Sequence, residues 1–462
     1  MDENTQIEDS LINWNELDRD DMTKERKPGE PHRIFVLQPY IKWGPRKALH
    51  TNAELQLEES LSLVRTLKWT VVDSAIYSVV SPGKKRVFGK GNFSELTERI
   101  VDSPSLTAVF VSLDRLTSLQ QKELEDAWNV DVFDRYTLVL EIFKQHARTR
   151  EAKLQIALAE IPVLRSRLRM KDKNFDQQSG AQQYIGGGGE TFLEVRQRVL
   201  AERELKIKKA LKKLKSKRHL LRKDRESKQY PVVSVVGYTN AGKTSLIKTM
   251  TGDADLRPRN ELFATLDVTA HRGTLTNGMT VIFMDTVGFI SNLPHDLVAS
   301  FSATLEDILV SDVIVHVRDI SHPDTVAQKM NVLRVLNELG LPEKLMENVI
   351  EVCNKSDLLN EEISFVPEIG SHVISATEGT GIEELRQAIQ KKALEVTDTV
   401  ACTLKIPMSG SHLSWLYKEA DVQQQRSLEG DSENMLVDVV MSARTQAKFR
   451  ARFGPEIVVE DK

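Results

Sequence analysis

The sequence predicts a multidomain α/β protein, and three observations carry this prediction. The chain has 462 residues, more than one hydrophobic core ordinarily serves, so about two to four domains are expected. Strand-like and helix-like segments alternate in two stretches, which are separated by a long stretch that is only helical. In the second alternating stretch, a glycine-containing turn has the residue spacing of a phosphate-binding loop.

The composition is that of a soluble globular chain, with 40% hydrophobic and 28% charged residues. Two cysteines, Cys353 and Cys402, are too few for a disulfide framework and have no metal-ligand neighbours, so a reducing intracellular compartment fits. No window of ~18 apolar residues occurs, and no membrane span is expected. The net charge of −4 does not indicate a nucleic-acid partner for the chain as a whole.

The N-terminal third is expected to hold a lead-in and a small domain. Residues 1–30 are acidic, without the apolar core of a secretory signal or the arginine-rich character of a mitochondrial presequence, and are expected to be a disordered acidic lead-in. Residues 31–137 are expected to form an N-terminal α/β subdomain with a largely parallel sheet, and show no recognisable catalytic constellation. The expected strands are 33–39, 69–79 and 106–114, and the expected helices are 53–67, 92–100 and 119–128.

Residues 138–228 are expected to form a long helical hairpin. Leucines and an isoleucine recur at helical spacing in its first half, with a kink expected at Pro162. The second helix is expected from residue 191 to residue 228. Between the two helices, residues 171–190 are polar and glycine-rich, which predicts an extended tip.

The second hairpin helix is strongly basic. Thirteen lysines and arginines face three acids between Arg203 and Lys228. Such a segment attracts a polyanion through counterion release, although a merely solvated charged face is the alternative. Because basic residues fall on every side of the helix, RNA contact is favoured over that alternative. The candidate RNA-binding residues are Lys208, Lys209, Lys212, Lys213, Lys215 and Arg218.

Residues 229–398 are expected to form a nucleotide-binding domain. The stretch "GYTNAGKT" fits the pattern GxxxxGK[ST], follows an apolar strand and opens a helix, which is the context the pattern requires. Its glycines let backbone N–H groups point at phosphates, Lys243 brings a cation to the β- and γ-phosphates, and Thr244 supplies a Mg²⁺ ligand. A glycine turn before a core helix is the disfavoured alternative. The expected nucleotide-binding residues of this loop are Gly237, Tyr238, Thr239, Asn240, Ala241, Gly242, Lys243, Thr244 and Ser245.

Further short motifs, each following an apolar strand, indicate guanine. In "DTVG", Asp285 can reach Mg²⁺ through water and the Gly288 N–H can reach the γ-phosphate. In "NKSD", the Asp357 carboxylate can accept from N1–H and the 2-amino group of guanine, a donor pair that adenine lacks, and Lys355 would lie over the base. The remaining residues expected at the nucleotide are Asn354, Ser375, Ala376 and Thr377.

The segment "ELFATLDVT" lies between these motifs and is expected to be a switch. Thr265 is the favoured switch threonine that closes onto Mg²⁺ and the γ-phosphate, with Thr269 as the second candidate and an exposed turn hydroxyl as the alternative. The candidate catalytic residues are Lys243, Thr265 and Gly288. The candidate Mg²⁺ ligands are Thr244, Thr265 and Asp285.

Two residues depart from the pattern of Ras-like enzymes. Phe289 stands where those enzymes carry the glutamine that orients the attacking water, so either a partner supplies that group or unassisted hydrolysis is slow. Asn240 lies at a position that can ligate K⁺ in GxxNxGK[ST] GTPases, where the ion takes the place of an arginine finger. An asparagine that only stabilises the turn is an equally weighted alternative.

Residues 399–462 are expected to form a small α+β domain, with a strand at "CTLKIPM", a helix over 411–420, a second strand at "MLVDVVM" and a final basic helix. That helix favours RNA contact more weakly than the hairpin does.

Several of these stretches together resemble the HflX family of ribosome-associated GTPases. They are "ARTREAKLQIALAE", "GGGGET", "GYTNAGKTSL", "LFATLDVT" and "DTVGFISNLPHDLVASFSATLED", and the resemblance runs from about Arg33 to the C-terminus. "VRDISHPD" and "VLQPYIKWGPRK" look closer to the animal mitochondrial member than to bacterial forms. The resemblance implies an N-terminal α/β subdomain, a helical hairpin whose tip at 171–190 approaches the peptidyl-transferase centre, a Ras-like P-loop GTPase domain and a C-terminal domain.

The resemblance also implies a function. Family members bind the large ribosomal subunit and its rRNA and separate the subunits of stalled or idle ribosomes, with GTP as substrate and Mg²⁺ as cofactor. A GTPase chaperone of large-subunit rRNA maturation is the alternative, and a membrane-linked signalling GTPase is disfavoured because no lipidation motif is present. A monomer that binds neither DNA nor membrane is expected. The expected location is mitochondrial by resemblance, or cytoplasmic if the given N-terminus is the true start.

Overall fold

The computed structural model describes residues 31–42, 51–79, 81–83, 85–178, 192–228, 230–276, 278–291, 297, 307–359, 365–397, 399–428, 431–454 and 458–461. The acidic lead-in expected at 1–30 lies outside these residues. The chain divides into two compact units. The first contains residues 1–215, 261–267 and 290–302, and the second contains residues 216–260, 268–289 and 303–462.

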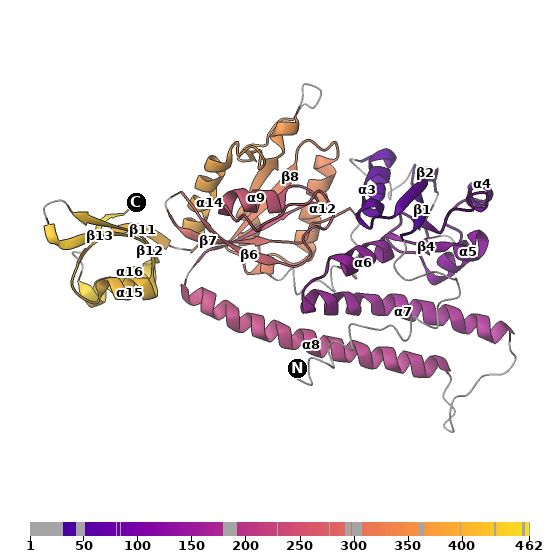
Figure 1. Cartoon of the computed structure of the whole chain (residues 1–462), viewed down its shortest axis with the longest axis horizontal. Coiled ribbons are helices and arrows are strands. Elements are labelled where there is room, and N and C mark those ends of the chain that lie inside the picture. Colours follow the sequence, from indigo (N-terminus) through magenta and orange to yellow (C-terminus); the bar gives the residue numbers. More distant parts are fainter. Residues whose placement is uncertain are drawn as a thin grey trace. The chain divides into compact units, whose positions relative to one another are not determined.

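The N-terminal part of the first unit is a four-stranded parallel sheet with helices packed against it (Figure 1). The strand order is β2-β1-β3-β4. The predicted strands and helices are confirmed, whereas β4 was not predicted because three residues are too few to show a period. The elements are β1 (Arg33–Tyr40), α3 (Ala53–Thr66), β2 (Thr70–Ser78), α4 (Lys90–Val101), β3 (Ala108–Val111), α5 (Ser118–Trp128) and β4 (Asp131–Phe133).

Alternating residues of the central strands build the core of this sheet. Phe35 and Leu37 of β1 and Val109 of β3 point to one face, where they pack against Leu96 of α4 and Leu124 of α5. Strand-flanking polar residues fix where the helices start. For example, the Thr117 hydroxyl accepts from the Gln120 N–H, and the Gln120 side chain accepts from the Thr117 N–H.

Three helices follow the sheet: α6 (Arg135–His146), α7 (Arg150–Gln178) and α8 (Phe192–Lys228). The domain boundary expected after residue 137 falls inside α6. Helix α7 continues through Pro162 and eight residues into the tip expected at 171–190, because residues 171–178 contain no glycine or proline, although most of them are polar. The remainder of the expected tip, up to residue 191, lies outside the described residues.

Helices α7 and α8 lie side by side and antiparallel (Figure 1). Leu154 and Ile161 of α7 share a buried cluster with Ile207 and Ala210 of α8. The Arg165 guanidinium binds the Glu204 carboxylate of α8 at 2.6 Å. The apolar stripe of α8 is therefore used against α7, and the exposed lysines of α8 lie on its other sides.

The second unit contains a six-stranded sheet of order β10-β9-β8-β5-β7-β6, in which only the β6–β7 pair is antiparallel. This is the expected Ras-like arrangement. The strands are β5 (Val232–Gly237), β6 (Thr269–Thr274), β7 (Thr280–Asp285), β8 (Val313–Asp319), β9 (Val349–Asn354) and β10 (His372–Val373). The helices are α9 (Lys243–Thr251), α12 (Thr325–Glu338), α13 (Glu343–Glu347), η1 (Ser356–Leu358) and α14 (Ile382–Thr397).

The two faces of this sheet are covered differently. Valines of β5 and β8 pack with α9 and α14 on one face. On the other face the buried Arg318 of β8 pairs with Glu351 of β9, which also binds Lys329 of α12 at 2.6 Å. Burial lowers the pKa of the neighbouring His316 to about 4, so this histidine is neutral in the core near pH 7.

The C-terminal part of the second unit is an antiparallel sheet of order β12-β13-β11-β14 with two helices on one face. The chain order is the split β-α-β-β-α-β motif. Cys402 and Leu404 of β11 and Val437 of β13 pack against Leu416 and Phe449 of the helices. The elements are β11 (Thr399–Pro407), α15 (His412–Glu419), β12 (Asp421–Leu428), β13 (Asp431–Ser442), α16 (Ala443–Phe453) and β14 (Val458–Asp461).

Candidate nucleotide-binding site

The predicted phosphate loop joins β5 to α9. Gly237 and Gly242 both have positive φ, at 156° and 94°. A Cβ at Gly237 would lie 2.2 Å from the Val317 carbonyl oxygen, and one at Gly242 would lie 2.2 Å from the Asn354 Nδ2. Only glycine fits these two positions, so the loop geometry itself requires the first and last glycines of the motif.

Lys243 is buried at the start of α9, as expected for the lysine of such a loop. Its Nζ donates to the carbonyl oxygens of Tyr238 at 2.9 Å and Gly237 at 3.2 Å. Burial lowers the pKa of Lys243 to about 8, and the nearby Asp285 carboxylate partly offsets this effect. The ammonium thus lies inside the loop, where incoming phosphate would favour its charged form.

Two of the three expected Mg²⁺ ligands lie together. The Thr244 hydroxyl donates to the Asp285 Oδ2 at 2.7 Å, where the carboxyl ends of the neighbouring strands β5 and β7 bring both residues to one edge. A hydroxyl and a buried carboxylate are hard oxygen ligands of the kind Mg²⁺ prefers. The pair fits a Mg²⁺ that completes its coordination with phosphate and water. No cluster of three metal-ligating His, Cys, Asp or Glu side chains occurs among the described residues.

The "DTVG" segment lies directly against the phosphate loop. The Thr239 N–H donates to the Phe289 carbonyl oxygen at 2.7 Å, and the Phe289 N–H donates to the Gly237 carbonyl oxygen at 3.1 Å. A Cβ at Gly288 would lie 2.7 Å from the Thr239 Cγ2 and 3.1 Å from the Lys243 Nζ. The Phe289 ring is 2% exposed and offers no hydrogen-bonding group for a water molecule. This backbone pairing was not predicted from the sequence.

The motifs expected at the base meet around one amide. The Asn354 Nδ2 donates to the Ala241 carbonyl oxygen at 2.8 Å, and its Oδ1 accepts from the Ala376 N–H at 3.0 Å. The Ser375 hydroxyl donates to the Asp357 Oδ1 at 2.7 Å. The structure therefore brings together three segments of the chain, and two of them, at Ala241 and Asn354, are 113 residues apart in the sequence. Thr377 follows them in an exposed position.

Asp319 lies at the same sheet edge and was not predicted from the sequence. The Lys355 Nζ binds the Asp319 Oδ2 at 2.6 Å. Asp319 is the last residue of β8 and pairs in register with Asn354, the last residue of β9. Its position at the carboxyl end of a buried parallel strand was the available signal, since ligands of α/β sheets bind at these ends.

The expected switch threonine belongs to the first unit. Thr265 lies in the segment 261–267, which packs on the α6–α7 region. The Phe263 ring meets the Phe143 ring edge-on with centroids 4.8 Å apart, and the Thr149 N–H donates to the Asp267 Oδ2 at 3.2 Å. Thr269, the second candidate, starts β6 in the second unit, where its hydroxyl lies 2.9 Å from the His271 Nε2.

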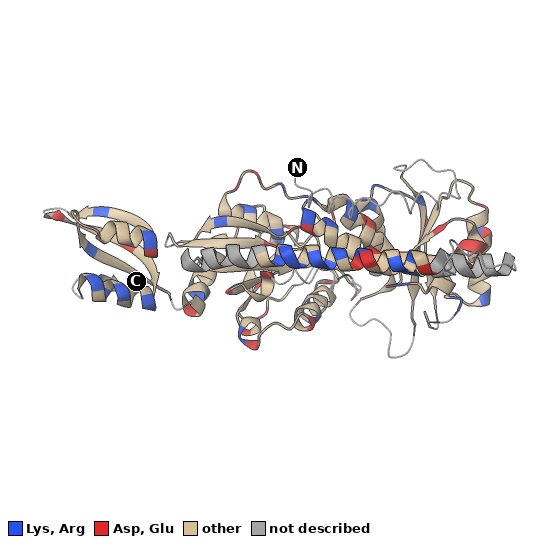
Figure 2. Cartoon of the chain, turned by 90° about the horizontal axis from the view of Figure 1, so that it is seen from below, with Lys and Arg blue, Asp and Glu red and all other residues tan. Residues whose placement is uncertain are grey.

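The candidate RNA-binding residues form an exposed basic face on α8, visible as the blue stretch of that helix in Figure 2. Lys208 also pairs with Glu204 at 2.5 Å. The side chain of Arg218 lies outside the described residues. The exposed members of the face are Lys208, Lys209, Lys212, Lys213 and Lys215.

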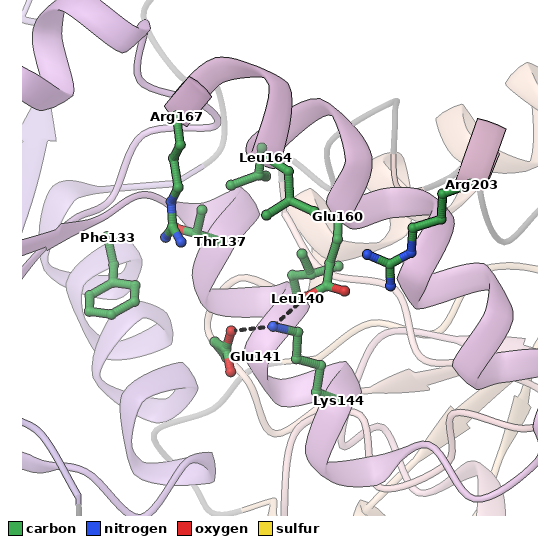
Figure 3. Close-up of a pocket in the computed structure, with 10 residues that line it drawn as sticks. Phe133, Thr137, Leu140, Glu141, Lys144, Glu160, Leu164, Arg167 and Arg203 are labelled. Atoms are coloured by element: carbon green, nitrogen blue, oxygen red, sulfur yellow. Dashed lines mark hydrogen bonds and ion pairs between the residues drawn. The ribbon is translucent and has the colours of Figure 1, made fainter. Parts of the chain in front are cut away.

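A cavity of about 70 Å³ lies in the first unit between α6, α7 and α8 (Figure 3). The Lys144 ammonium binds Glu141 at 2.8 Å and Glu160 at 2.5 Å, and the buried Arg203 lines the same cavity. Because two carboxylates oppose the basic groups here, the cavity wall is close to neutral. We assign it a structural role, in which the Lys144–Glu160 ion pair attaches α6 to α7 of the hairpin.

The fold and these loops define a P-loop guanine-nucleotide-binding protein. Three family models match the chain: a GTP-binding GTPase N-terminal region at residues 54–144, a GTP-binding GTPase middle region at 146–225, and a 50S ribosome-binding GTPase at 232–355. The structure has no membrane-crossing helix among its described residues, none being both long and apolar enough.

Relatives cover most of the chain. GTP-binding protein 6 of Xenopus laevis is 50% identical over 91% of this chain and 80% of its own length, and that of Homo sapiens is 48% identical over 92% and 82%. GTPase HflX of Caldanaerobacter subterraneus is 38% identical over 74% of this chain and 79% of its own. The chain belongs to the HflX family of GTPases, which are GTP-hydrolysing enzymes.

Lys243 gives the site a measurable proton linkage. With its pKa lowered to about 8 in this structure, Lys243 is partly neutral at pH 8.5 and largely charged at pH 7, and a bound polyphosphate raises that pKa. GTP binding is therefore expected to take up a larger fraction of a proton at pH 8.5 than at pH 7. Calorimetry in buffers of different ionisation enthalpy measures this uptake. A Lys243→Met variant that still binds GTP should show none, and equal uptake in the two proteins would contradict the assignment.

Proposed function

We propose that this protein is a GTP-driven switch that binds the large ribosomal subunit and promotes dissociation of the ribosomal subunits. The observation that carries the proposal is the combination, in one chain, of the assembled GTP site with the exposed basic face of α8. The HflX relatives and the 50S ribosome-binding GTPase model support a ribosomal partner. We propose a mitochondrial ribosome as the partner, because "VRDISHPD" and "VLQPYIKWGPRK" resemble the animal mitochondrial member of the family, and a monomer that uses neither DNA nor a membrane.

The proposed roles of the nucleotide-site residues follow from their positions. Backbone N–H groups of the phosphate loop bind the α- and β-phosphates, and the Lys243 ammonium binds the β- and γ-phosphates. Asp357, oriented by the Ser375 hydroxyl, selects guanine. Thr244, Asp285 and Thr265 would hold Mg²⁺, which neutralises charge on the phosphates when it is bound with GTP.

Hydrolysis is proposed to depend on a partner. Phe289 has a buried ring, and its backbone groups are paired with the phosphate loop, so this residue cannot orient the attacking water as a glutamine would. Docking on the ribosome is proposed to complete the site. The Gly288 N–H and Thr265 would contact the γ-phosphate while GTP is bound. Hydrolysis removes these contacts, and the protein then releases its partner.

The large subunit is therefore expected to stimulate GTP hydrolysis at least ~10-fold, since partner-completed GTPases gain much more than this. Lys209→Glu, Lys212→Glu and Lys213→Glu together should abolish most of the stimulation and flatten its salt dependence, because they remove sequence-independent phosphate contacts. Steady-state hydrolysis with purified subunits measures both effects.

A control reverses the charge of two exposed lysines outside the hairpin, Lys344→Glu and Lys391→Glu, and should keep the stimulation. Basal hydrolysis should be equal in all three proteins. Hydrolysis that is fast alone and indifferent to subunits would overturn the ribosomal proposal. Stimulation by precursor subunits but not by mature ones would instead support a chaperone of large-subunit maturation.

Asn240 is proposed to support a K⁺ requirement. It is exposed in the phosphate loop and has a left-handed backbone with φ of 60°, which asparagine tolerates better than most residues. Hydrolysis stimulated by the large subunit should be several-fold faster in K⁺ than in Na⁺ at equal ionic strength, and Asn240→Ala should remove the difference. Equal rates in the two salts would leave Asn240 with a turn-stabilising role only.

A further inference from the structure

The ion pair between Lys355 and Asp319 is held from both ends. Asp319 is 9% exposed, and its Oδ1 accepts from the Ser321 N–H at 3.1 Å and from the Ser321 hydroxyl at 2.6 Å. Its Oδ2 binds the Lys355 ammonium at 2.6 Å. The carboxylate therefore cannot rotate without losing several bonds at once.

The other end of Lys355 is fixed by its backbone. Lys355 has a φ of 68°, in the left-handed region, and it lies between Asn354, whose side chain binds the phosphate loop, and the short helix η1. The Ile320 N–H donates to the Asn354 carbonyl oxygen at 3.1 Å, which ties the loop after β8 to the start of this segment. The Lys355 side chain is thus held at its backbone and at its ammonium group, at the carboxyl edge of the sheet.

A lysine side chain ordinarily loses rotamer freedom when it packs on a ligand. Here the ion pair with Asp319 already restricts the rotamers of Lys355 before a nucleotide binds, so binding costs less side-chain entropy. Asp357 is oriented by a different residue, Ser375, whose hydroxyl donates to the Asp357 Oδ1 at 2.7 Å. The two aspartates should therefore affect different properties of nucleotide binding.

We propose that Asp319 is a positioning residue for guanine nucleotides: it holds the aliphatic part of the Lys355 side chain in place over the base before the nucleotide binds. The inference rests on the proposed guanine-nucleotide site at Asn354, Lys355 and Asp357. Asp319 therefore increases the affinity for any purine diphosphate on whose base the Lys355 side chain can pack, and Asp357 determines the preference for guanine.

The test measures dissociation constants of the full-length protein for GDP and for inosine diphosphate, which lacks the 2-amino group. Asp319→Asn is the informative change, because its amide oxygen can still accept from Ser321 while the charge that holds Lys355 is removed. This variant should bind both nucleotides about 5-fold more weakly, with an unchanged ratio between them. Glu338→Gln, which breaks an ion pair with Arg334 on α12, is the control and should bind like the parent protein.

A double-mutant cycle separates positioning from a structural effect. In a Lys355→Met background, Asp319→Asn should cause no further loss of affinity, because the residue through which it acts no longer carries a charge. An additive loss, or a wild-type affinity of the single variant, would overturn the proposal.

Asp357→Asn tests the site on which the inference rests. It should abolish the preference for GDP over inosine diphosphate, with or without Asp319. If Asp357→Asn leaves that preference intact, the guanine site itself is wrongly placed. If it abolishes the preference while Asp319→Asn has no effect, only the positioning role fails.

Discussion

The side chain of Asn354 is the connection on which the nucleotide site depends. A carboxamide has both donors and an acceptor, and Asn354 uses them in opposite directions: Nδ2 toward the phosphate loop at Ala241 and Oδ1 toward the loop at Ala376. The residue is 2% exposed, so a lost partner could not be replaced by bulk water. Gly242 completes the contact because any Cβ there would collide with this amide.

Around this connection the parallel sheet supplies the rest of the geometry. Strands β5, β7, β8 and β9 end at the same edge of the sheet. Residues at or just after these strand ends therefore lie close together, so that Thr244 contacts Asp285 and Lys355 contacts Asp319. The buried Arg318–Glu351 pair and the neutral His316 lie on one face of the same strands. The chemistry of the site therefore depends on the register of a few buried strands.

The sequence was informative where short-range rules determine the structure. The phosphate loop was predictable because glycine spacing, a preceding apolar strand and a following helix occur within one stretch. The same holds for the first helix of the hairpin, in which apolar residues recur at helical spacing. The contacts of Phe289 with Gly237 and Thr239 were not predictable, because they are backbone pairings that side-chain identity does not specify. Asp319 was missed because its partner is 36 residues away, β4 because it is too short, and β12 because its polar residues show no apolar alternation.

Thr265 shows a different limit of prediction from sequence. The motif spacing predicts the chemical role of this residue, but it does not predict in which part of the fold the residue lies. Its segment packs on the α6–α7 region through Phe263 and Asp267, in the unit that also contains most of the basic helix α8. A residue expected to respond to GTP is thus on the same unit as the proposed ribosome-binding face.

The affinity of an Asn354→Ala variant for GDP tests the central connection most directly. If Asn354 holds the phosphate loop and the base loops in register, two lost hydrogen bonds should weaken GDP binding by roughly 100-fold, although this side chain is not proposed to contact the phosphates. The melting temperature without nucleotide, measured on the same variant, shows whether the domain remains folded. A folded variant that binds GDP as tightly as the parent protein would contradict the account.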